Sequence, residues 1–305
     1  FGTYVTLFPQ LIAGPIVRYK DVCDQLEERK ETVSKFASGV NRFVTGLAKK
    51  LILGDSAAAV AELLERNAEF ETTVVGTWLI MLCYTFHIYF DFSGYSDMAI
   101  GLGRMFGFEF VENFNYPYIA KSITDFWRRW HITLSTWFRE YIYIPLGGNR
   151  VSKPRAFFNL AAVWFLTGFW HGADWNYILW GVYFWVFLVI EKAFLGKLLQ
   201  KIPALGHIYS LIIVGFGWII FFHSDLSVIA DTAKHLVGIG ADFASASIGY
   251  TLFRLLPFIM ICALACTPLP KRIYCKLQEK LNFVSAISPI FIAILFAVCI
   301  GYYRG

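Results

Sequence analysis

The sequence predicts an all-α integral membrane protein: a multi-helix bundle with interfacial amphipathic helices and a broken, re-entrant segment around a central polar cavity. Of its 305 residues, 57% are hydrophobic and only 16% are charged, which is too apolar for an ordinary soluble domain. Lipid offers no partner to unpaired backbone groups, so the spanning elements are expected to be helices. Six stretches lack Lys, Arg, Asp and Glu and are each about long enough to cross a roughly 30 Å hydrocarbon core: 72–90, 156–173, 175–190, 202–224, 255–270 and 281–303.

Two long charged stretches are predicted to lie along the membrane surface. Residues 18–71 and 121–143 alternate charge clusters with apolar residues, the second with a heavier aromatic load. Helices of this type tend to lie in the interface rather than cross it. No internal repeat divides the chain, so we expect residues 1–305 to form a single membrane domain. Its apolar start has no basic leader and is not a signal peptide, and we expect further helices to precede it.

The distribution of positive charge predicts an orientation. If the apolar stretches alternate in direction, loops 91–155, 191–201 and 271–280 share one side and carry eight, three and four Lys/Arg, whereas loop 225–254 carries two. The positive-inside rule then makes the first group cytoplasmic. The nine Lys/Arg of residues 18–71 conflict with this assignment, and a surface-lying or re-entrant segment would remove the conflict.

Cysteine use and net charge exclude several classes of protein. The six cysteines are scattered without a C-x-x-C pair, so we expect neither a metal or redox centre nor a disulfide framework. A net charge of +5 without a basic, aromatic-interleaved face does not indicate nucleic-acid binding. The positive charge is instead expected to face lipid headgroups of the bilayer.

The most informative polar residue is His171. Between Arg155 and Glu191 the only charged residue is Asp174, and a single helix over this stretch would run about 50 Å, too long for one crossing. Two helices must share it, with a break around 168–175. Non-helical backbone at membrane depth is tolerated where it lines a water-filled cavity, so His171 is predicted to line one.

The surroundings of His171 favour chemistry over structure. A histidine that only hydrogen-bonds a neighbouring helix is the structural alternative, but intramembrane polar residues are costly and often functional. Gly168 and Gly172 are expected to leave space beside the imidazole, and three tryptophans, Trp170, Trp175 and Trp180, to wall a pocket. A neutral imidazole takes a proton near physiological pH, as a hydroxyl nucleophile attacking an acyl group requires.

A second histidine, His131, lies in the preceding amphipathic stretch. Asp125 and Arg129 are spaced i,i+4 on a predicted helix, so an ion pair is the structural interpretation for both. The alternative is that these two residues and Arg128 help to shape the site. His131 is either a structural hydrogen-bonder or a supporting residue of the site, and we favour the second.

Two acids, Asp91 and Asp97, follow an apolar span, and His87 lies one helical turn before Asp91. Solvation of a helix end would explain the acids, and lining a polar conduit is the functional alternative. The glycines at 94, 101, 103 and 107 indicate close helix packing, not a phosphate loop.

Four long strings of the sequence together resemble one known family. They are "FPQLIAGPI" (8–16), "YFDFSGYSDMAIGLGRMFGF" (89–108), "NFNYPYIAKSITDFWRRWHITLSTWFREYIYIPLGGNR" (113–150) and "LTGFWHGADWNYILWG" (166–181). They closely resemble the membrane-bound O-acyltransferase (MBOAT) family, in its bacterial alginate O-acetyltransferase-like branch. The resemblance extends in order over about residues 8–190, and several helices normally precede the first string.

The resemblance implies a function and two catalytic residues. The histidine of "WHG" corresponds to His171, the family's catalytic histidine, and that of "RRWH" corresponds to its companion, His131. It implies a multi-pass protein of the bacterial inner membrane that moves an acetyl group to hydroxyls of an extracytoplasmic polysaccharide or to a periplasmic acetyltransferase partner. The donor would be a cytoplasmic thioester, acetyl-CoA or an acylated carrier protein, with no bound cofactor.

Three alternatives remain at the level of sequence. The D-alanyl transferases of teichoic acid synthesis form a sister branch, but the string "PLGGNR" (145–150) favours polysaccharide acetylation. A transporter or channel would use the same polar residues as a permeation path, although transporters often show paired breaks in repeated halves and this chain shows one break. A non-catalytic scaffold of a polysaccharide secretion complex is the third.

Overall fold

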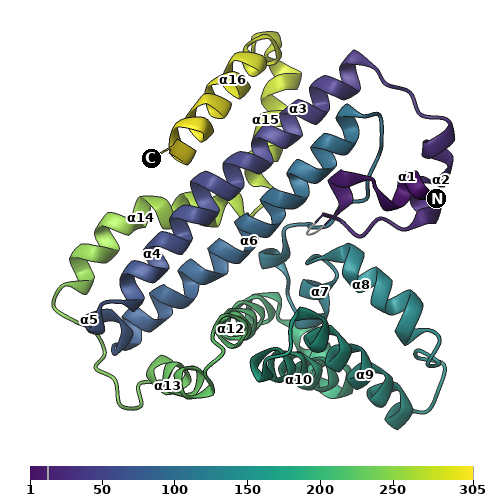
Figure 1. The fold of residues 1–305 in the computed structure, drawn as a ribbon. Coiled ribbons are helices and arrows are strands. Elements are labelled where there is room, and N and C mark those ends of the chain that lie inside the picture. Colours follow the sequence, from purple (N-terminus) through teal and green to yellow (C-terminus); the bar gives the residue numbers. More distant parts are fainter. Residues whose placement is uncertain (12–13, 305) are drawn as a thin grey trace.

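The structure, a computed structural model, describes residues 1–11 and 14–304, so residues 12 and 13 of the "FPQLIAGPI" string lie outside the described residues. All regular elements in this part are helical, which confirms the predicted all-α class (Figure 1). The first half contains α1 (Gly2–Val5), η1 (Phe8–Gln10), α2 (Tyr19–Glu27), α3 (Val33–Ala48), η2 (Lys49–Asp55), α4 (Ser56–Glu65), α5 (Ala68–Glu71), α6 (Val74–Met105), η3 (Pro117–Ile119), α7 (Ile123–Trp127), α8 (Ile132–Phe138) and η4 (Arg139–Tyr143).

The second half contains α9 (Lys153–His171), α10 (Trp175–Ile190), η5 (Glu191–Leu195), α11 (Gly196–Lys201), α12 (Pro203–Phe222), α13 (Leu226–Leu236), α14 (Ile248–Ala265), α15 (Leu269–Lys280) and α16 (Asn282–Arg304). Five described helices are long and apolar enough to cross a membrane: Val74–Met105, Trp175–Lys201, Pro203–Phe222, Ile248–Ala265 and Phe283–Tyr303. The sixth predicted span, 156–173, forms α9, which begins with Lys153 and Arg155 and is less apolar than the five.

A long helical pair forms the centre of the molecule. The helices α3, η2 and α4 join into one helix over residues 33–65 that runs antiparallel to α6 (Figure 1). Glycines on both helices permit this approach, because a Cβ at Gly94 would lie 2.6 Å from the Gly46 carbonyl oxygen and one at Gly101 would lie 2.7 Å from that of Gly39. Residues 33–65 therefore pack along the candidate membrane-spanning helix α6, and do not lie on the membrane surface as expected.

Helix α6 is longer than predicted. The expected span 72–90 continues as one helix to Met105, so Asp91 and Asp97 lie inside a helix and not at its end. Helix end solvation therefore does not explain these acids. Their carboxylates form ion pairs with Lys49 and Lys50 of the neighbouring helix. The helix can therefore continue through both charged residues.

The predicted break near His171 is confirmed. Helix α9 ends at His171 and α10 begins at Trp175, and the two helices form a tight hairpin. The glycines serve this packing, since a Cβ at Gly168 would lie 2.4 Å from the Tyr177 carbonyl oxygen and one at Gly172 would lie 2.6 Å from the Tyr177 ring. The expectation that these two glycines leave open space beside His171 is therefore wrong.

The prediction of a loop at 191–201 is also wrong, because α10 continues as a helix through η5 and α11 to Lys201.

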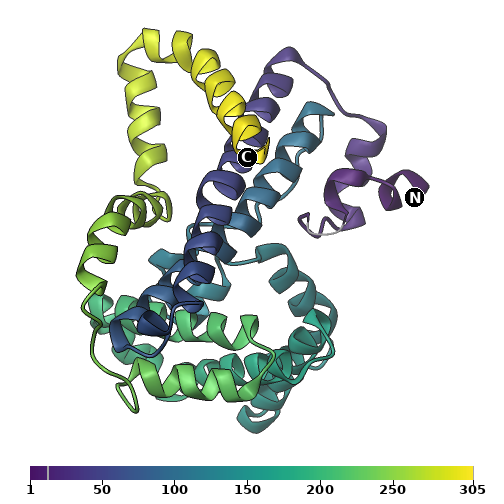
Figure 2. The ribbon, with the colours of Figure 1, turned by 60° about the vertical axis from the view of Figure 1, so that its left-hand side comes forward.

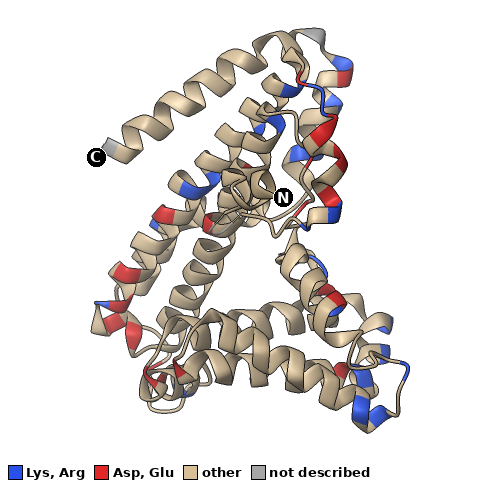
Figure 3. Ribbon diagram, turned by 45° about the vertical axis from the view of Figure 1, so that its right-hand side comes forward, with Lys and Arg blue, Asp and Glu red and all other residues tan. Residues whose placement is uncertain are grey.

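The hairpin of α9 and α10 packs with α7, α8 and α12 in one lobe, and α14 to α16 form an arm on the opposite side of the long pair (Figures 1 and 2). Charged residues gather on α2 to α4 and on the connection before α9, while α16 is almost uncharged (Figure 3).

Candidate functional site

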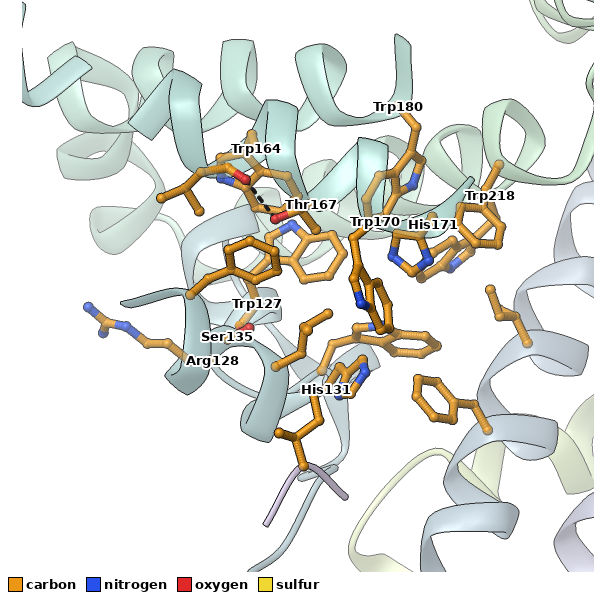
Figure 4. Close-up of a pocket in the computed structure, with 18 of the residues that line it drawn as sticks. Trp127, Arg128, His131, Ser135, Trp164, Thr167, Trp170, His171, Trp180 and Trp218 are labelled. Carbon is orange, nitrogen blue, oxygen red and sulfur yellow. Dashed lines mark hydrogen bonds between the residues drawn. The ribbon is translucent and has the colours of Figure 1, made fainter. Parts of the chain in front are cut away.

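One large cavity, of about 650 Å³, opens between α6, α7, α8, α9, α10 and α12. Its wall is mainly aromatic, and tryptophans from four of these helices surround it (Figure 4). Such a mostly apolar cavity with a few polar groups is the usual form of a binding site for small molecules. Five of the nine predicted site residues line it, namely His171, His131, Asp91, Arg128 and Trp170.

His171 is the last residue of α9, where the helix stops at the break. Its imidazole packs edge-to-face against Trp180 and Phe221, with ring centroids 5.1 and 5.0 Å away. In the described part of the chain its ring nitrogens form no side-chain hydrogen bond, in contrast to those of His131 and His87. Aromatic rings thus pack against the imidazole, and its nitrogens remain available to a ligand in the cavity.

Trp170 stands between the two predicted catalytic histidines. Its ring centroid lies 4.8 Å from that of His171 and 6.3 Å from that of His131. Figure 4 shows the indole between the two imidazoles, with His171 coming from α9 and His131 from the start of α8. Two side chains from separate segments therefore face one cavity, with a flat apolar spacer between them.

His131 is more deeply buried than His171 and is fixed by polar contacts. Its side chain is 5% exposed, its Nδ1 lies 3.0 Å from the Asn113 Oδ1 atom, and Phe92 packs edge-to-face on its ring at 4.7 Å. Burial foremost, and then the neighbouring His171, lower the pKa of the His131 imidazole to about 3. His131 is therefore neutral at physiological pH.

The polar mouth of the cavity contains two arginines. Arg128 follows α7 and Arg139 follows α8, and both line the cavity. In Figure 4, Arg128 points away from the cluster of tryptophans. A guanidinium at an opening attracts anionic groups and binds them through a planar set of donors. Arg139 has a carboxylate nearby, with 3.8 Å between its Nη2 and a Glu140 oxygen.

The two acids of α6 have different positions. Asp97 is buried, does not line the cavity, and binds Lys49 at 2.6 Å and Arg42 at 2.6 Å. Asp91 lines the cavity but also pairs with Lys50. We call these five residues, all between the 33–65 helix and α6, the ion-pair seam.

Three further predicted residues lie outside the cavity. Asp125 and Arg129 form the i,i+4 ion pair that is their structural interpretation, at 2.9 Å, and Ser122 caps α7 by accepting from the Asp125 N–H. Trp175 is 76% exposed and does not line the cavity. The turn after His171 directs Trp175 outward, whereas Trp180 lines the cavity as expected.

Sequence reasoning missed two buried residues that support the site. Asn113 is fully buried and binds His131. Glu191 is buried at the end of α10 and accepts hydrogen bonds from the backbone N–H groups of Ile123 and Thr124 at 2.5 and 2.9 Å. This carboxylate fastens the α10 end to the start of α7, the helix that leads to His131. Its only signal in the sequence is a charge at the end of an apolar stretch.

The indole N–H groups of Trp127 and Trp180 have no hydrogen-bond partner within the described residues, although both atoms are buried. Both side chains line the cavity, and their rings contact each other at 5.5 Å. Unpaired buried donors are uncommon in proteins.

Residues 1–11 and 14–304 contain no cluster of three His, Cys, Asp or Glu side chains that could hold a metal ion.

Comparison with known proteins places these residues in a family. The sequence profile of MBOAT, the membrane-bound O-acyltransferase family, matches residues 1–229, which include His131 and His171. The chain is 48% identical to a probable alginate O-acetylase of Azotobacter vinelandii, over 75% of this chain and 46% of that protein. It is 38% identical to a peptidoglycan O-acetyltransferase of Helicobacter pylori, over 78% and 46% of the two chains.

A teichoic acid D-alanyltransferase of Bacillus subtilis is more distant, at 32% identity over 63% of this chain and 51% of that protein. The chain thus spans about half the length of the curated relatives it matches. The family profile nevertheless covers most of the chain, including α6 to α12 and the whole cavity wall. This protein belongs to the membrane-bound O-acyltransferase family.

Proposed function

We propose that the protein is a multi-pass O-acyltransferase of the bacterial inner membrane, which transfers an acetyl group from a cytoplasmic thioester to hydroxyls of an extracytoplasmic polysaccharide. One observation supports this most strongly: His131 and His171, from two separate segments, both face a 650 Å³ aromatic cavity. An apolar cavity excludes water, which would otherwise hydrolyse a thioester, and holds a hydroxyl and an acyl carbon in one place.

His171 is the general base in this proposal. Its unprotonated ring nitrogen takes the proton of the acceptor hydroxyl while the oxygen attacks the carbonyl carbon of the thioester. The C–S bond then breaks, and the leaving thiolate takes the proton from the imidazolium of His171. The products are an ester and a thiol, and the base returns to its neutral form. Burial among rings favours that neutral form at the start of each cycle.

The roles of the other residues follow from their positions. His131 and Trp170 would orient the reacting groups, and Arg128 would attract the anionic part of the donor, acetyl-CoA or an acylated carrier protein. Asp91 belongs to both the cavity wall and the ion-pair seam. Asp97, Asp125, Arg129 and Trp175 would act only on the fold, because they lie outside the cavity lining.

The acceptor is proposed from the relatives. Higher identity to an alginate O-acetylase than to a teichoic acid D-alanyltransferase favours acetyl transfer and a polysaccharide hydroxyl. A periplasmic acetyltransferase that takes the acetyl group onward would serve equally well as the receiving partner. Both acceptors require the cavity to open away from the donor side.

Reconstitution tests the proposed reaction. The full-length protein in proteoliposomes, supplied with radiolabelled acetyl-CoA or an acetylated carrier on one side, should esterify alginate or peptidoglycan fragments on the other. Protein-free vesicles supply the control. Flux of a small solute without ester formation would instead support a transporter, and neither activity in a well-inserted protein would support a scaffold.

The orientation has its own test. We expect residues near Lys197 to face the cytoplasm and Ser227 to face outward. Lys197 is exposed, whereas a Cβ at the neighbouring Gly196 would lie 2.8 Å from the Glu191 carbonyl oxygen. Single cysteines at 197 and 227, in a background without native cysteines, should differ in labelling by an impermeant maleimide in intact cells. Equal labelling would refute the orientation.

A further inference from the structure

Asn113 carries the most informative unassigned contacts in the molecule. It lies in the segment between α6 and α7, is fully buried, and precedes the histidine it touches by 18 residues. Three consecutive residues donate hydrogen bonds to it. The Asn113 backbone carbonyl accepts from the Ile132 N–H at 2.9 Å, and its Oδ1 atom lies 3.0 Å from His131 Nδ1 and 3.3 Å from the Thr133 backbone nitrogen.

These contacts hold an unfavourable backbone conformation. His131 has φ +43°, in the left-handed region that side chains other than glycine rarely adopt. Such a residue persists only where its surroundings fix it, and it is enriched at functional sites. Asn113 binds this residue and the two that follow it, so it fixes both the turn and the direction in which the imidazole enters the cavity.

The contacts also determine which nitrogen of His131 carries the proton. A backbone N–H can only donate, so the bond from the Thr133 nitrogen makes the Asn113 Oδ1 atom an acceptor. The other end of the amide, Asn113 Nδ2, donates to the Ser96 hydroxyl at 2.9 Å. Because Oδ1 accepts, His131 Nδ1 must be the donor, and in a neutral imidazole the other nitrogen, Nε2, is then unprotonated.

We infer that Asn113 is a positioning residue that locks His131 in its Nδ1–H tautomer and presents the Nε2 lone pair to the cavity. Nε2 forms no hydrogen bond within the described residues and is not among their buried unpaired atoms, so it meets the cavity space. His131 therefore accepts a hydrogen bond from an N–H or O–H of the substrate and does not donate one to the acyl carbonyl. This role rests on the proposed acyl transfer, but the tautomer itself does not.

Nitrogen NMR tests the tautomer without any assay of activity. The full-length protein with ¹⁵N-labelled histidine, in membranes at pH 7.5, should show a His131 ring with protonated Nδ1 and unprotonated Nε2. The signals are assigned by their loss in His131→Gln. A protonated Nε2, or an equal mixture of tautomers, would overturn the inference even if acyl transfer is observed. The expected tautomer in a protein without transferase activity would instead reject the proposed function alone.

Substitutions of Asn113 test its control over His131. Asn113→Ala should give a mixture of tautomers and lower acyl transfer about tenfold to hundredfold, because small misplacements of catalytic groups have effects of that size. Asn113→Asp keeps the acceptor but adds a negative charge beside Nδ1, which stabilises the imidazolium. It should keep Nδ1 protonated and move the acidic limb of the rate profile to higher pH.

Asn159→Ala is the matched control. Asn159 is equally buried and donates to the carbonyl oxygens of Leu146 and Gly148, outside the contacts of His131. Its substitution is expected to lower stability but to leave the His131 tautomer and the pH profile unchanged. If Asn113→Ala behaved in the same way, with an unchanged tautomer and profile, Asn113 would be merely a structural residue and the inference would fall.

Discussion

The ion-pair seam and the cavity adjoin each other on α6, but the charged side chains of the seam are paired, whereas the His171 imidazole in the cavity is not paired within the described residues. In the seam, Asp97 binds two cations at 2.6 Å and has no contact with the cavity. In the cavity, the His171 imidazole packs edge-to-face against Trp180 and Phe221, and its nitrogens form no side-chain hydrogen bond within the described residues. Paired groups stabilise a fold, whereas unpaired titratable groups in a cavity are available for chemistry. Polarity inside an apolar helix bundle is therefore not by itself a sign of function.

The strongest test of the seam is the loss of Asp97. Asp97→Leu leaves Arg42 and Lys49 without their shared partner in a mostly buried place. Removing one partner of a buried ion pair costs about 3–5 kcal/mol of unfolding free energy, and the loss here should lie at the lower end because Arg42 keeps its pair with Glu112. Denaturant titration in detergent would measure it, and the acyl-transfer rate per folded molecule should stay near that of the wild type. A loss of rate without a loss of stability would move Asp97 from the seam to the site.

The glycine contacts between the 33–65 helix and α6 should come next in size. A Cβ at Gly101 would lie 2.6 Å from the backbone nitrogen of Phe43, so Gly101→Val must separate α3 from α6. Overpacking of this kind costs about 1–3 kcal/mol. Gly301→Ala in α16 is the control, because nothing lies within 4 Å of its added Cβ. Equal stability of the two variants would contradict the close approach of the two helices.

Acid should destabilise the cavity side through His131. Its pKa is about 3 in the folded protein and about 6.5 in an unfolded chain. The stability that depends on the neutral imidazole is therefore complete above about pH 6.5 and is lost as the pH falls toward 3. Between pH 7 and pH 5 the loss amounts to about 2 kcal/mol. Thermal unfolding at both values would measure it, and His131→Gln should be less sensitive to acid. Equal sensitivity would reject a buried neutral His131.

The smallest effect is expected at the border of the two regions. Asp91 and Lys50 are each about one-third exposed, so their pair contributes at most about 1 kcal/mol. Asp91→Asn should hardly change stability. Its acyl-transfer rate is the informative quantity, because Asp91 also lines the cavity. A changed KM or a lower kcat of this variant would assign Asp91 to the site, and unchanged kinetics would assign it to the seam.

The sequence alone predicted the helical class, the break beside His171 and the pairing of two histidines in one family pattern. These features are local, because each depends on an uninterrupted apolar stretch or on a motif of adjacent residues. The partners of Asp97 were not predictable in this way, since Arg42 and Lys49 lie on another helix and only the antiparallel register brings them to it. The predicted span 72–90 ended too early for the same reason. Its two acids indicate the end of a membrane-spanning helix unless the cations that pair with them are known.

The supporting residues of the site were the hardest to predict. Asn113 stands in an aromatic-rich stretch with no spacing pattern toward His131, and only the left-handed turn at His131 joins them. Trp175 was expected to wall the pocket, but the direction of the turn exposes it. Trp218 lines the cavity from α12 without a distinguishing motif.

The most direct test of the central claim is the acyl-transfer rate of full-length His171→Gln, measured together with its unfolding free energy. Glutamine forms hydrogen bonds but does not take up a proton, and general-base catalysis is worth about 10²–10⁴-fold. We predict a rate loss in that range with normal membrane insertion and a stability within about 1 kcal/mol of the wild type. Asp97→Asn should show the opposite pattern, lower stability and a nearly normal rate per folded molecule. Wild-type transfer by a well-folded His171→Gln protein would contradict the assignment of His171 as the base.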